Sequence, residues 1–211
     1  ADMFLSIPMA HQMSTLFTIL DGTKNKQMLK VMRPYQVYAT KAVLNELKQA
    51  DFDLPINKLG YVWHTTGSGK TITSFKTAWL ASRMPNVDKV IFVVDRIALT
   101  KQTEDNYKAY DPEGSIDDGG KENNNVSGTL NTDALERKLN KSGYGIIVTS
   151  VQKLNTLIKR KNFVVPKKKF VFIVDEAHRS TGGESFEELQ KVFKGAAWVG
   201  YTGTPMFDEV V

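Results

Sequence analysis

Two short motifs carry residue types suited to holding a nucleoside triphosphate. Residues 65–71 read Thr-Thr-Gly-Ser-Gly-Lys-Thr, a glycine-rich loop that ends in Lys-Thr. Residues 175–178 read Asp-Glu-Ala-His and follow the apolar run Phe-Val-Phe-Ile-Val. Backbone N–H groups and a lysine can hold phosphates, while a hydroxyl and a carboxylate can hold the accompanying magnesium ion. In this order, the two motifs predict a protein that uses ATP and Mg²⁺.

The glycine-rich loop departs from the strict pattern, which is Gly, four residues and then Gly-Lys-Ser/Thr. His64 occupies the position of the first glycine. In the remainder, glycines free the backbone to wrap around phosphates, Lys70 can reach the β and γ oxygens, and Thr71 can offer its hydroxyl to magnesium at the start of a helix. The expected nucleotide-binding residues here are Thr66, Gly67, Ser68, Gly69, Lys70 and Thr71.

The acidic motif supplies the other half of the expected site. Asp175 ends an apolar run, and the carboxyl ends of strands are where open α/β sheets place their ligand-binding groups. We expect Asp175 to bind the magnesium ion and Glu176 to act as general base on the attacking water. A lone Asp-Glu at a strand end is often only a turn into a helix, but Ala177 and His178 disfavour that interpretation. Lys70 and Glu176 are therefore the expected catalytic residues.

Short apolar runs alternate with helix-like stretches along most of the chain. The runs are rich in Val, Ile or aromatic residues and lack strict polar alternation, which is typical of strands buried on both faces of a parallel sheet. They are residues 61–63, 89–94, 144–148, 170–174 and 197–201. Helical periods occupy residues 33–48, 71–83 and 184–194. The alternation predicts an α/β domain with a mostly parallel central sheet flanked by helices.

Some segments need a separate interpretation. In the first helical stretch, apolar residues recur at helical spacing at Tyr35, Tyr38, Ala39, Ala42 and Val43. Residues 110–128 are crowded with Asp, Gly and Asn and predict a long mobile surface loop. Residues 1–24 follow no usable period, and we expect them to be a lead-in from a preceding domain.

Composition narrows the class of protein. The chain has 211 residues, is 41% hydrophobic and contains no cysteine, so disulfides and thiolate metal sites are excluded. No apolar stretch reaches the roughly 18 residues of a membrane span, and a secretory signal is not expected, so we predict no membrane association and a cytoplasmic location. A net charge of +5 suits an anionic partner such as nucleic acid. The basic clusters at 159–161 and 167–169 are more simply interpreted as solvated faces.

Five motifs in series resemble the motor region of type I restriction enzymes, in particular the first RecA-like lobe of their restriction (R) subunit, within helicase superfamily 2. The resemblance covers about residues 25–211. The motifs are Arg-Pro-Tyr-Gln at 33–36, Trp-His-Thr-Thr-Gly-Ser-Gly-Lys-Thr at 63–71, Val-Asp-Arg-Ile-Ala-Leu at 94–99, Asp-Glu-Ala-His-Arg-Ser at 175–180 and Tyr-Thr-Gly-Thr-Pro at 201–205. The resemblance implies a P-loop NTPase lobe that couples ATP hydrolysis to translocation along double-stranded DNA before cleavage.

The resemblance also implies roles for individual residues. Gln36 would read the adenine edge with Arg33 as a helper, although without the resemblance Gln36 would be an exposed helix residue. The expected coupling residues between the ATP site and the DNA track are His178, Thr202 and Thr204. The expected contacts to the DNA backbone are Arg96, Thr149, Ser150 and Gln152.

The resemblance also implies further domains and subunits of the whole enzyme. A second lobe, which would supply an arginine finger, and a nuclease domain are expected outside residues 25–211. Methylation and specificity subunits are the expected protein partners. Three alternatives stay open: a lobe of another superfamily 2 DNA or RNA helicase, a nucleotide-dependent DNA-binding scaffold, and a small-molecule kinase. Glu176 argues against the scaffold, since a scaffold needs no catalytic base, and the Asp-Glu-Ala-His motif does not fit the kinase.

Overall fold

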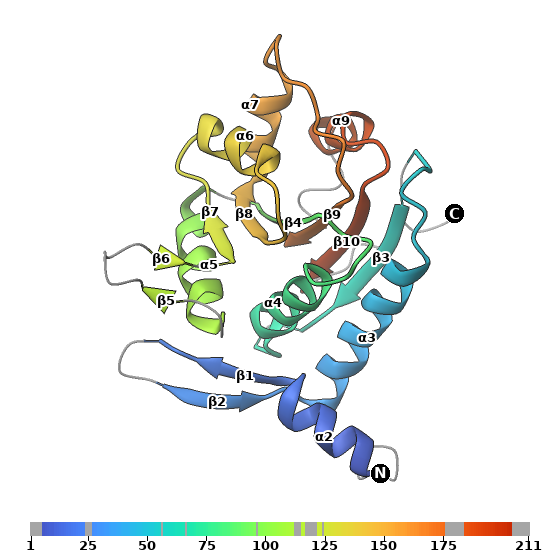
Figure 1. Cartoon of the computed structure of the whole chain (residues 1–211), viewed down its shortest axis with the longest axis vertical. Coiled ribbons are helices and arrows are strands. Elements are labelled where there is room, and N and C mark those ends of the chain that lie inside the picture. The colour runs from blue at the N-terminus through green and yellow to red at the C-terminus, as the bar shows by residue number, and fades with distance from the viewer. Residues whose placement is uncertain are drawn as a thin grey trace.

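A parallel sheet forms the centre of the chain (Figure 1). The computed structural model describes residues 6–23, 27–55, 57–65, 67–95, 97–111, 115–116, 122–123, 125–175 and 184–203. Within them, six strands pair in the order β3-β10-β9-β4-β8-β7, and every neighbouring pair is parallel. The strands are β3 (Asn57–Trp63), β4 (Lys89–Val94), β7 (Val126–Gly128), β8 (Ile146–Ser150), β9 (Phe170–Asp175) and β10 (Ala197–Thr202).

Helices cover both faces of this sheet (Figure 1). One face packs against α3 (Pro34–Gln49), α4 (Lys70–Ala81) and α5 (Ile97–Tyr110). The other face packs against α6 (Thr132–Asn140), α7 (Val151–Ile158) and α9 (Glu184–Val192). The predicted α/β architecture, with a parallel sheet flanked by helices, is confirmed.

The central strands are buried on both faces, as their apolar runs predict. In β4, Val90 and Phe92 belong to the hydrophobic cluster on one face, whereas Ile91 and Val93 belong to the cluster on the other. The edge strand β3 differs: Tyr61 is 65% and Trp63 62% exposed. The expectation of two-sided burial is therefore wrong for β3, because no described strand lies beyond it and its outer side chains face open surface.

The expected loop at residues 110–128 is wrong in part. Val126 to Gly128 forms β7, which pairs in parallel with β8 at the far edge of the sheet, and Val126 is buried. A three-residue strand is too short to show a period, and its polar surroundings conceal it. Two further pairs of residues form a small antiparallel ladder between β5 (Ser115–Ile116) and β6 (Glu122–Asn123).

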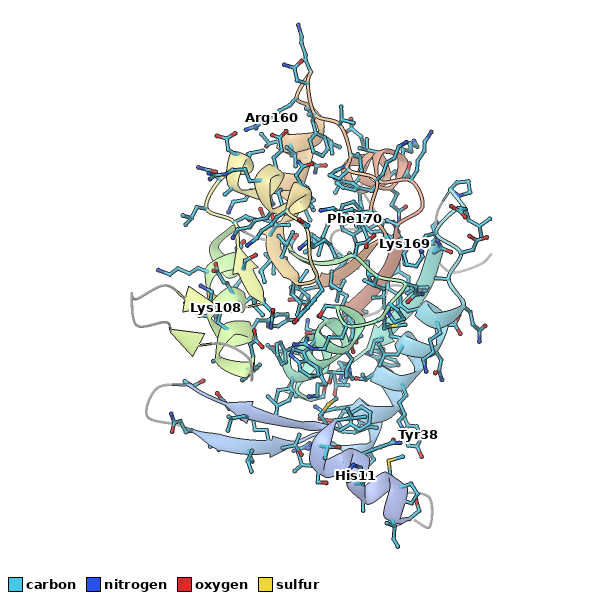
Figure 2. The ribbon with its side chains drawn as sticks, in the orientation of Figure 1. His11, Tyr38, Lys108, Arg160, Lys169 and Phe170 are labelled. Atoms are coloured by element: carbon cyan, nitrogen blue, oxygen red, sulfur yellow. The ribbon has the colours of Figure 1, made fainter. Side chains whose placement is uncertain are left out.

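The buried face of α3 also differs from the apolar spacing in its sequence. Tyr35 and Tyr38 are exposed, and Tyr38 is labelled in Figure 2. The buried residues of the helix are Gln36, Val37, Thr40, Val43 and Leu47. The buried face of α3 therefore includes two polar residues. Gln36 and Thr40 can be buried because each has a hydrogen-bond partner inside the protein.

The N-terminal residues form regular structure that packs on the lobe. They comprise α2 (Ile7–Thr15) and an antiparallel hairpin of β1 (Thr18–Asp21) and β2 (Met28–Val31). Phe17 and Ile19 are buried in the same hydrophobic cluster as residues of α3, α4 and α5. Whether a domain boundary falls at residue 24 stays a prediction.

Lys76 of α4 connects the lobe to this hairpin from a buried position. Its Nζ donates to the Thr18 carbonyl at 3.2 Å and lies 4.7 Å from the centre of the Trp79 ring. Burial above all, and then the charge of Arg83, lowers the pKa of Lys76 to about 8. The charged form is therefore destabilised in the folded protein at neutral pH.

We expect Lys76→Met to change how stability depends on pH. Between about pH 8 and pH 10.5 the unfolded wild type binds more protons at this lysine than the folded protein does, so wild-type stability gains up to about 3 kcal/mol as pH rises through this window. The variant should lack this gain. Urea unfolding at pH 7, 8, 9 and 10 measures it, and equal pH dependence in both proteins would contradict the burial-shifted pKa.

Candidate nucleotide-binding site

The parallel strands bring the two predicted motifs together at one edge of the sheet. Trp63, which ends β3, pairs with Thr202 at the end of β10, and Tyr201 pairs with Asp175 at the end of β9. The glycine-rich loop follows β3 directly and leads into α4. The Tyr-Thr-Gly-Thr-Pro motif at 201–205, which contains the expected coupling residues Thr202 and Thr204, is called the coupling motif below. Because strands β3, β10 and β9 are neighbours, the loop, the start of the coupling motif and Asp175 occupy adjacent strand ends.

Lys70 and Asp175 meet at this edge. Lys70 Nζ lies 3.0 Å from Asp175 Oδ1, and both side chains are only partly exposed. The two residues are 105 positions apart in sequence (175 minus 70). The sequence predicts that both belong to one nucleotide site, but it does not predict this direct contact. A lysine held by a carboxylate at a helix start can exchange that partner for phosphate oxygens while the carboxylate turns to a metal ion.

The loop geometry suits an anion. Gly67 and Gly69 have φ angles of 79° and 82°, which favour glycine, and a Cβ on Gly69 would lie 2.5 Å from Gln36 Nε2. The twelve-residue helix α4 begins at Lys70, so its N-terminal N–H groups and positive dipole end face the same edge. Thr71 is exposed there. These groups fit a triphosphate with its metal ion.

The start of α3 braces the loop from outside. Gln36 is 4% exposed, its Oε1 accepts from the Arg33 N–H at 2.8 Å, and its Nε2 donates to the Ser68 carbonyl at 2.9 Å. The Tyr35 hydroxyl donates to the same carbonyl at 2.7 Å. Gln36 is therefore a buried brace of the loop and not an exposed helix residue. Its contact with adenine stays a prediction, since both ends of the amide bind protein here.

A cavity of about 580 Å³ opens between the loop and the start of α3. Its lining consists of Arg33, Tyr35, Trp63, His64, Thr65, Gly67 and Ser68. The volume lies within the range of small-molecule sites. Sequence reasoning selected Arg33 and the loop but missed Tyr35 and Trp63 as site residues. The signal was present: Tyr35 lies inside the motif at 33–36 and Trp63 inside the motif at 63–71.

The coupling motif is tied to the strand that precedes the loop. The His64 N–H donates to the Thr202 carbonyl at 2.9 Å, and the Trp63 indole Nε1 donates to the Gly203 carbonyl at 3.2 Å. Thr202 itself is buried. The structure thus places Thr202 beside the loop, while its role in coupling stays a prediction.

The residues expected to contact DNA differ in accessibility. Thr149 and Ser150 are buried: the Thr149 hydroxyl accepts from Thr129 Oγ1, and the Ser150 hydroxyl caps α7 by accepting from the Lys153 N–H. Gln152 is exposed and donates to the Asp95 carbonyl at 2.9 Å. Among the described residues of this set, Gln152 is therefore the side chain that solvent or a phosphate can reach.

Several predicted site residues lie outside the described part of the chain. They are Thr66, Arg96, Glu176, His178 and Thr204. Among the residues that are described, no group of three or more acidic or histidine side chains gathers to hold a metal ion. Likewise, no helix of the described ranges has the length and apolarity to cross a membrane.

The two basic clusters make contacts within the protein. Arg160 donates to Asp133 at 2.6 Å and to Glu136 at 3.1 Å, and it lies at the opposite end of the molecule from His11 (Figure 2). Lys168 Nζ donates to three carbonyls at the end of α6. Lys168 precedes β9, whose C-terminal end carries Asp175. This cluster therefore lies at the N-terminal ends of the strands, opposite the candidate site.

Comparison with known proteins agrees with this geometry. The family model of the SWI2/SNF2 ATPases matches residues 35–210. Among solved structures, the SWI2/SNF2 ATPase core of Sulfolobus solfataricus, determined in complex with double-stranded DNA, is similar with a TM-score of 0.59 and 16% identity. The match covers 86% of this chain and 34% of that one. The likeness confirms the RecA-like fold that the motifs predict.

Curated relatives narrow the family. A type I restriction enzyme endonuclease subunit of Staphylococcus aureus (strain MSSA476) is 37% identical over 99% of this chain, which spans 21% of that subunit. The C-terminal part of a putative type I restriction enzyme endonuclease subunit of Mycoplasma pneumoniae is 41% identical, over 78% of this chain and 80% of that protein. The chain therefore belongs to the SWI2/SNF2 ATPases and, among them, to the endonuclease subunits of type I restriction enzymes.

Proposed function

We propose that this chain is the first motor lobe of a type I restriction subunit, in which ATP hydrolysis drives translocation along double-stranded DNA. The observation that carries the proposal is the meeting of Lys70 and Asp175, 3.0 Å apart, beside a glycine-rich helix start. The chain spans about a fifth of the Staphylococcus aureus relative, so cleavage and assembly belong to the proposal for the whole protein.

The described residues divide the work of holding the nucleotide. Lys70 would leave Asp175 for the β and γ phosphates, and the loop N–H groups would hold the remaining oxygens. Thr71 and Asp175 would hold the metal ion, which when bound neutralises phosphate charge and orients the γ-phosphate. Glu176, next to Asp175 in sequence, would accept a proton from the attacking water.

The cavity beside the loop suits the nucleobase. Tyr35 and Trp63 offer exposed aromatic faces on which adenine can stack, and the neighbouring Arg33 adds donors. Gln36 would reach the adenine edge by exchanging its contacts with Ser68 or Arg33, which couples base recognition to the shape of the loop. We infer that ATP binding is therefore sensed by the start of α3.

The DNA track would lie on the same edge of the sheet, where Gln152 is exposed next to Asp95. The Sulfolobus solfataricus neighbour was determined in complex with double-stranded DNA, which agrees with the duplex proposed as the track here. Methylation and specificity subunits are the proposed partners, and a cytoplasmic location is the corresponding proposal for the whole enzyme.

We expect DNA binding by the full subunit to be insensitive to base sequence and strongly weakened by salt. In the proposed track, the exposed Gln152 amide and Arg96 would contact phosphates, which carry no sequence information. Each neutralised phosphate contributes a slope of about −0.9 in log K against log salt. Binding titrations with double-stranded DNA, single-stranded DNA and RNA, at several salt concentrations, measure this. Gln152→Ala should weaken the binding of the full subunit to duplexes of all sequences equally.

The control for that variant is Thr156→Ala, one turn further along α7 and also exposed. It should leave binding unchanged, because it lies farther from the strand ends. Tighter binding to RNA than to duplex DNA would instead favour an RNA helicase lobe, which recognises 2′-hydroxyls. Duplex affinity that hardly changes with salt would contradict a backbone-tracking motor.

A further inference from the structure

His64, the residue that breaks the strict glycine-loop pattern, is packed deep between two aromatic rings. It is 4% exposed, and its ring centre lies 5.8 Å from that of Tyr35 and 6.2 Å from that of Tyr201, nearly parallel to the latter at 16°. A glycine here would leave this space empty. The position therefore has a packing role that the glycine of other loops does not have.

The hydrogen bonds of Ser68 fix the tautomer of His64. Ser68 Oγ lies 2.6 Å from the Thr65 carbonyl, and at that distance the single hydroxyl hydrogen must lie between the two oxygens. His64 Nδ1, 3.0 Å from the same Oγ, must then carry a hydrogen and donate it. Nε2 is left without a hydrogen, buried and without a partner among the described residues.

The surroundings of His64 favour the neutral form of its ring. Burial, and next the charge of Lys70, lower the pKa of His64 below its ordinary value. In the neutral ring, the hydrogen on Nδ1 leaves Nε2 without one. The Nδ1–H that donates to Ser68 is present in the charged ring as well, so this bond does not depend on the charge state of His64.

His64 also belongs to the strand ends that carry the coupling motif. The backbone N–H of His64 donates to the Thr202 carbonyl, and the indole N–H of the neighbouring Trp63 donates to the Gly203 carbonyl. Tyr201, on which the His64 ring stacks, shares a hydrogen bond of 2.7 Å with Thr77 of α4. The His64 side chain thus lies in contact with both Ser68 of the phosphate loop and Tyr201 of β10.

We propose that His64 is a positioning residue that transmits the state of the phosphate loop from Ser68 to the Tyr201–Gly203 end of β10. The proposal rests on the function proposed above, because it concerns the coupling of ATP turnover to DNA. It assigns a role to a position that the strict loop pattern reserves for glycine. His64 itself touches no reacting atom in this role.

The test uses the full-length subunit assembled with its DNA-recognition partners, and compares ATPase kcat and KM with and without duplex DNA. His64→Ala removes both the ring and the donor, whereas His64→Asn keeps a donor at the place of Nδ1. We expect His64→Ala to lower the DNA-stimulated kcat about tenfold, the loss of one positioned hydrogen bond, with KM for ATP changed by less than about threefold. His64→Asn should restore part of the stimulation, because it keeps a donor to Ser68 but lacks the ring that stacks on Tyr201.

Other results would overturn the proposal. Equal losses in His64→Ala and His64→Asn would mean that ring volume alone matters, and a rise in KM as large as the fall in kcat would mean a role in binding. If His64→Ala does not fold, His64→Gly, which has the strict loop pattern, replaces it under the same criteria. Wild type without DNA stimulation would instead refute the proposed motor function, which separates the two failures.

Discussion

Replacing Lys70 with alanine should weaken ATP binding by this lobe on the order of a hundredfold, the effect of losing charge-assisted hydrogen bonds to phosphate oxygens. The variant also leaves Asp175 without its 3.0 Å ion pair, so the loop loses a contact to β9. Calorimetric titration with ATP and magnesium measures the loss. The matched control is Lys58→Ala on β3, an exposed lysine outside the cavity lining, which should bind as wild type does.

Glu176→Gln in the full subunit provides the complementary comparison. Lys70 contacts ground-state phosphates, whereas Glu176 is proposed to act only on the attacking water, so the glutamine variant should bind ATP and fail to hydrolyse it. ATP affinity retained by Lys70→Ala, or normal turnover by Glu176→Gln, would show that the roles are assigned to the wrong residues.

ATP hydrolysis by this 211-residue lobe alone should be about 10³–10⁵ times slower than by a complete DNA-stimulated motor, the usual contribution of an arginine finger. The physical reason is that one lobe supplies one wall of the cleft, and the transition-state charge lacks the group proposed to come from a second lobe. Phosphate release, measured for the lobe and the full subunit under the same conditions, gives the ratio.

Binding of ATP by the lobe serves as the control for that comparison, because slow turnover is informative only when the nucleotide is bound. Turnover by the isolated lobe that approaches the rate of the full motor would refute the two-lobe mechanism. Addition of duplex DNA should not raise the rate of the lobe, since the proposed coupling needs both walls.

The parts of the site that could be predicted are those fixed by strand topology. Once residues 61–63, 170–174 and 197–201 are identified as parallel strands, the residues that follow them must share one edge of the sheet. The sequence therefore predicts that Lys70 and Asp175 lie near each other, and their side chains meet at 3.0 Å. The side chains of the cavity could not be predicted in this way. Spacing predicts that Tyr35 is a core residue, but in the structure Gln36 is the buried residue of this turn, and both side chains donate to the Ser68 carbonyl.

The helices and strands that the sequence analysis did not predict are short, or they have no continuous apolar face. Helices α6 and α7 have nine and eight residues, so each shows its helical period in only two or three apolar positions, but each begins with a capping side chain. Asn131 accepts from the Ala134 N–H, and Ser150 accepts from the Lys153 N–H. Cap positions followed by leucines at spacings of three and four were the available signal for both helices.

The position of Trp63 gives the protein an intrinsic optical reporter. Its indole is 62% exposed, lines the cavity and is bonded to the Gly203 carbonyl. The other two tryptophans are packed elsewhere: Trp79 against Arg83 and Trp198 against Phe172. A change in emission on adding ATP would therefore come from Trp63, so that nucleotide occupancy and movement of the coupling motif become visible without a dye.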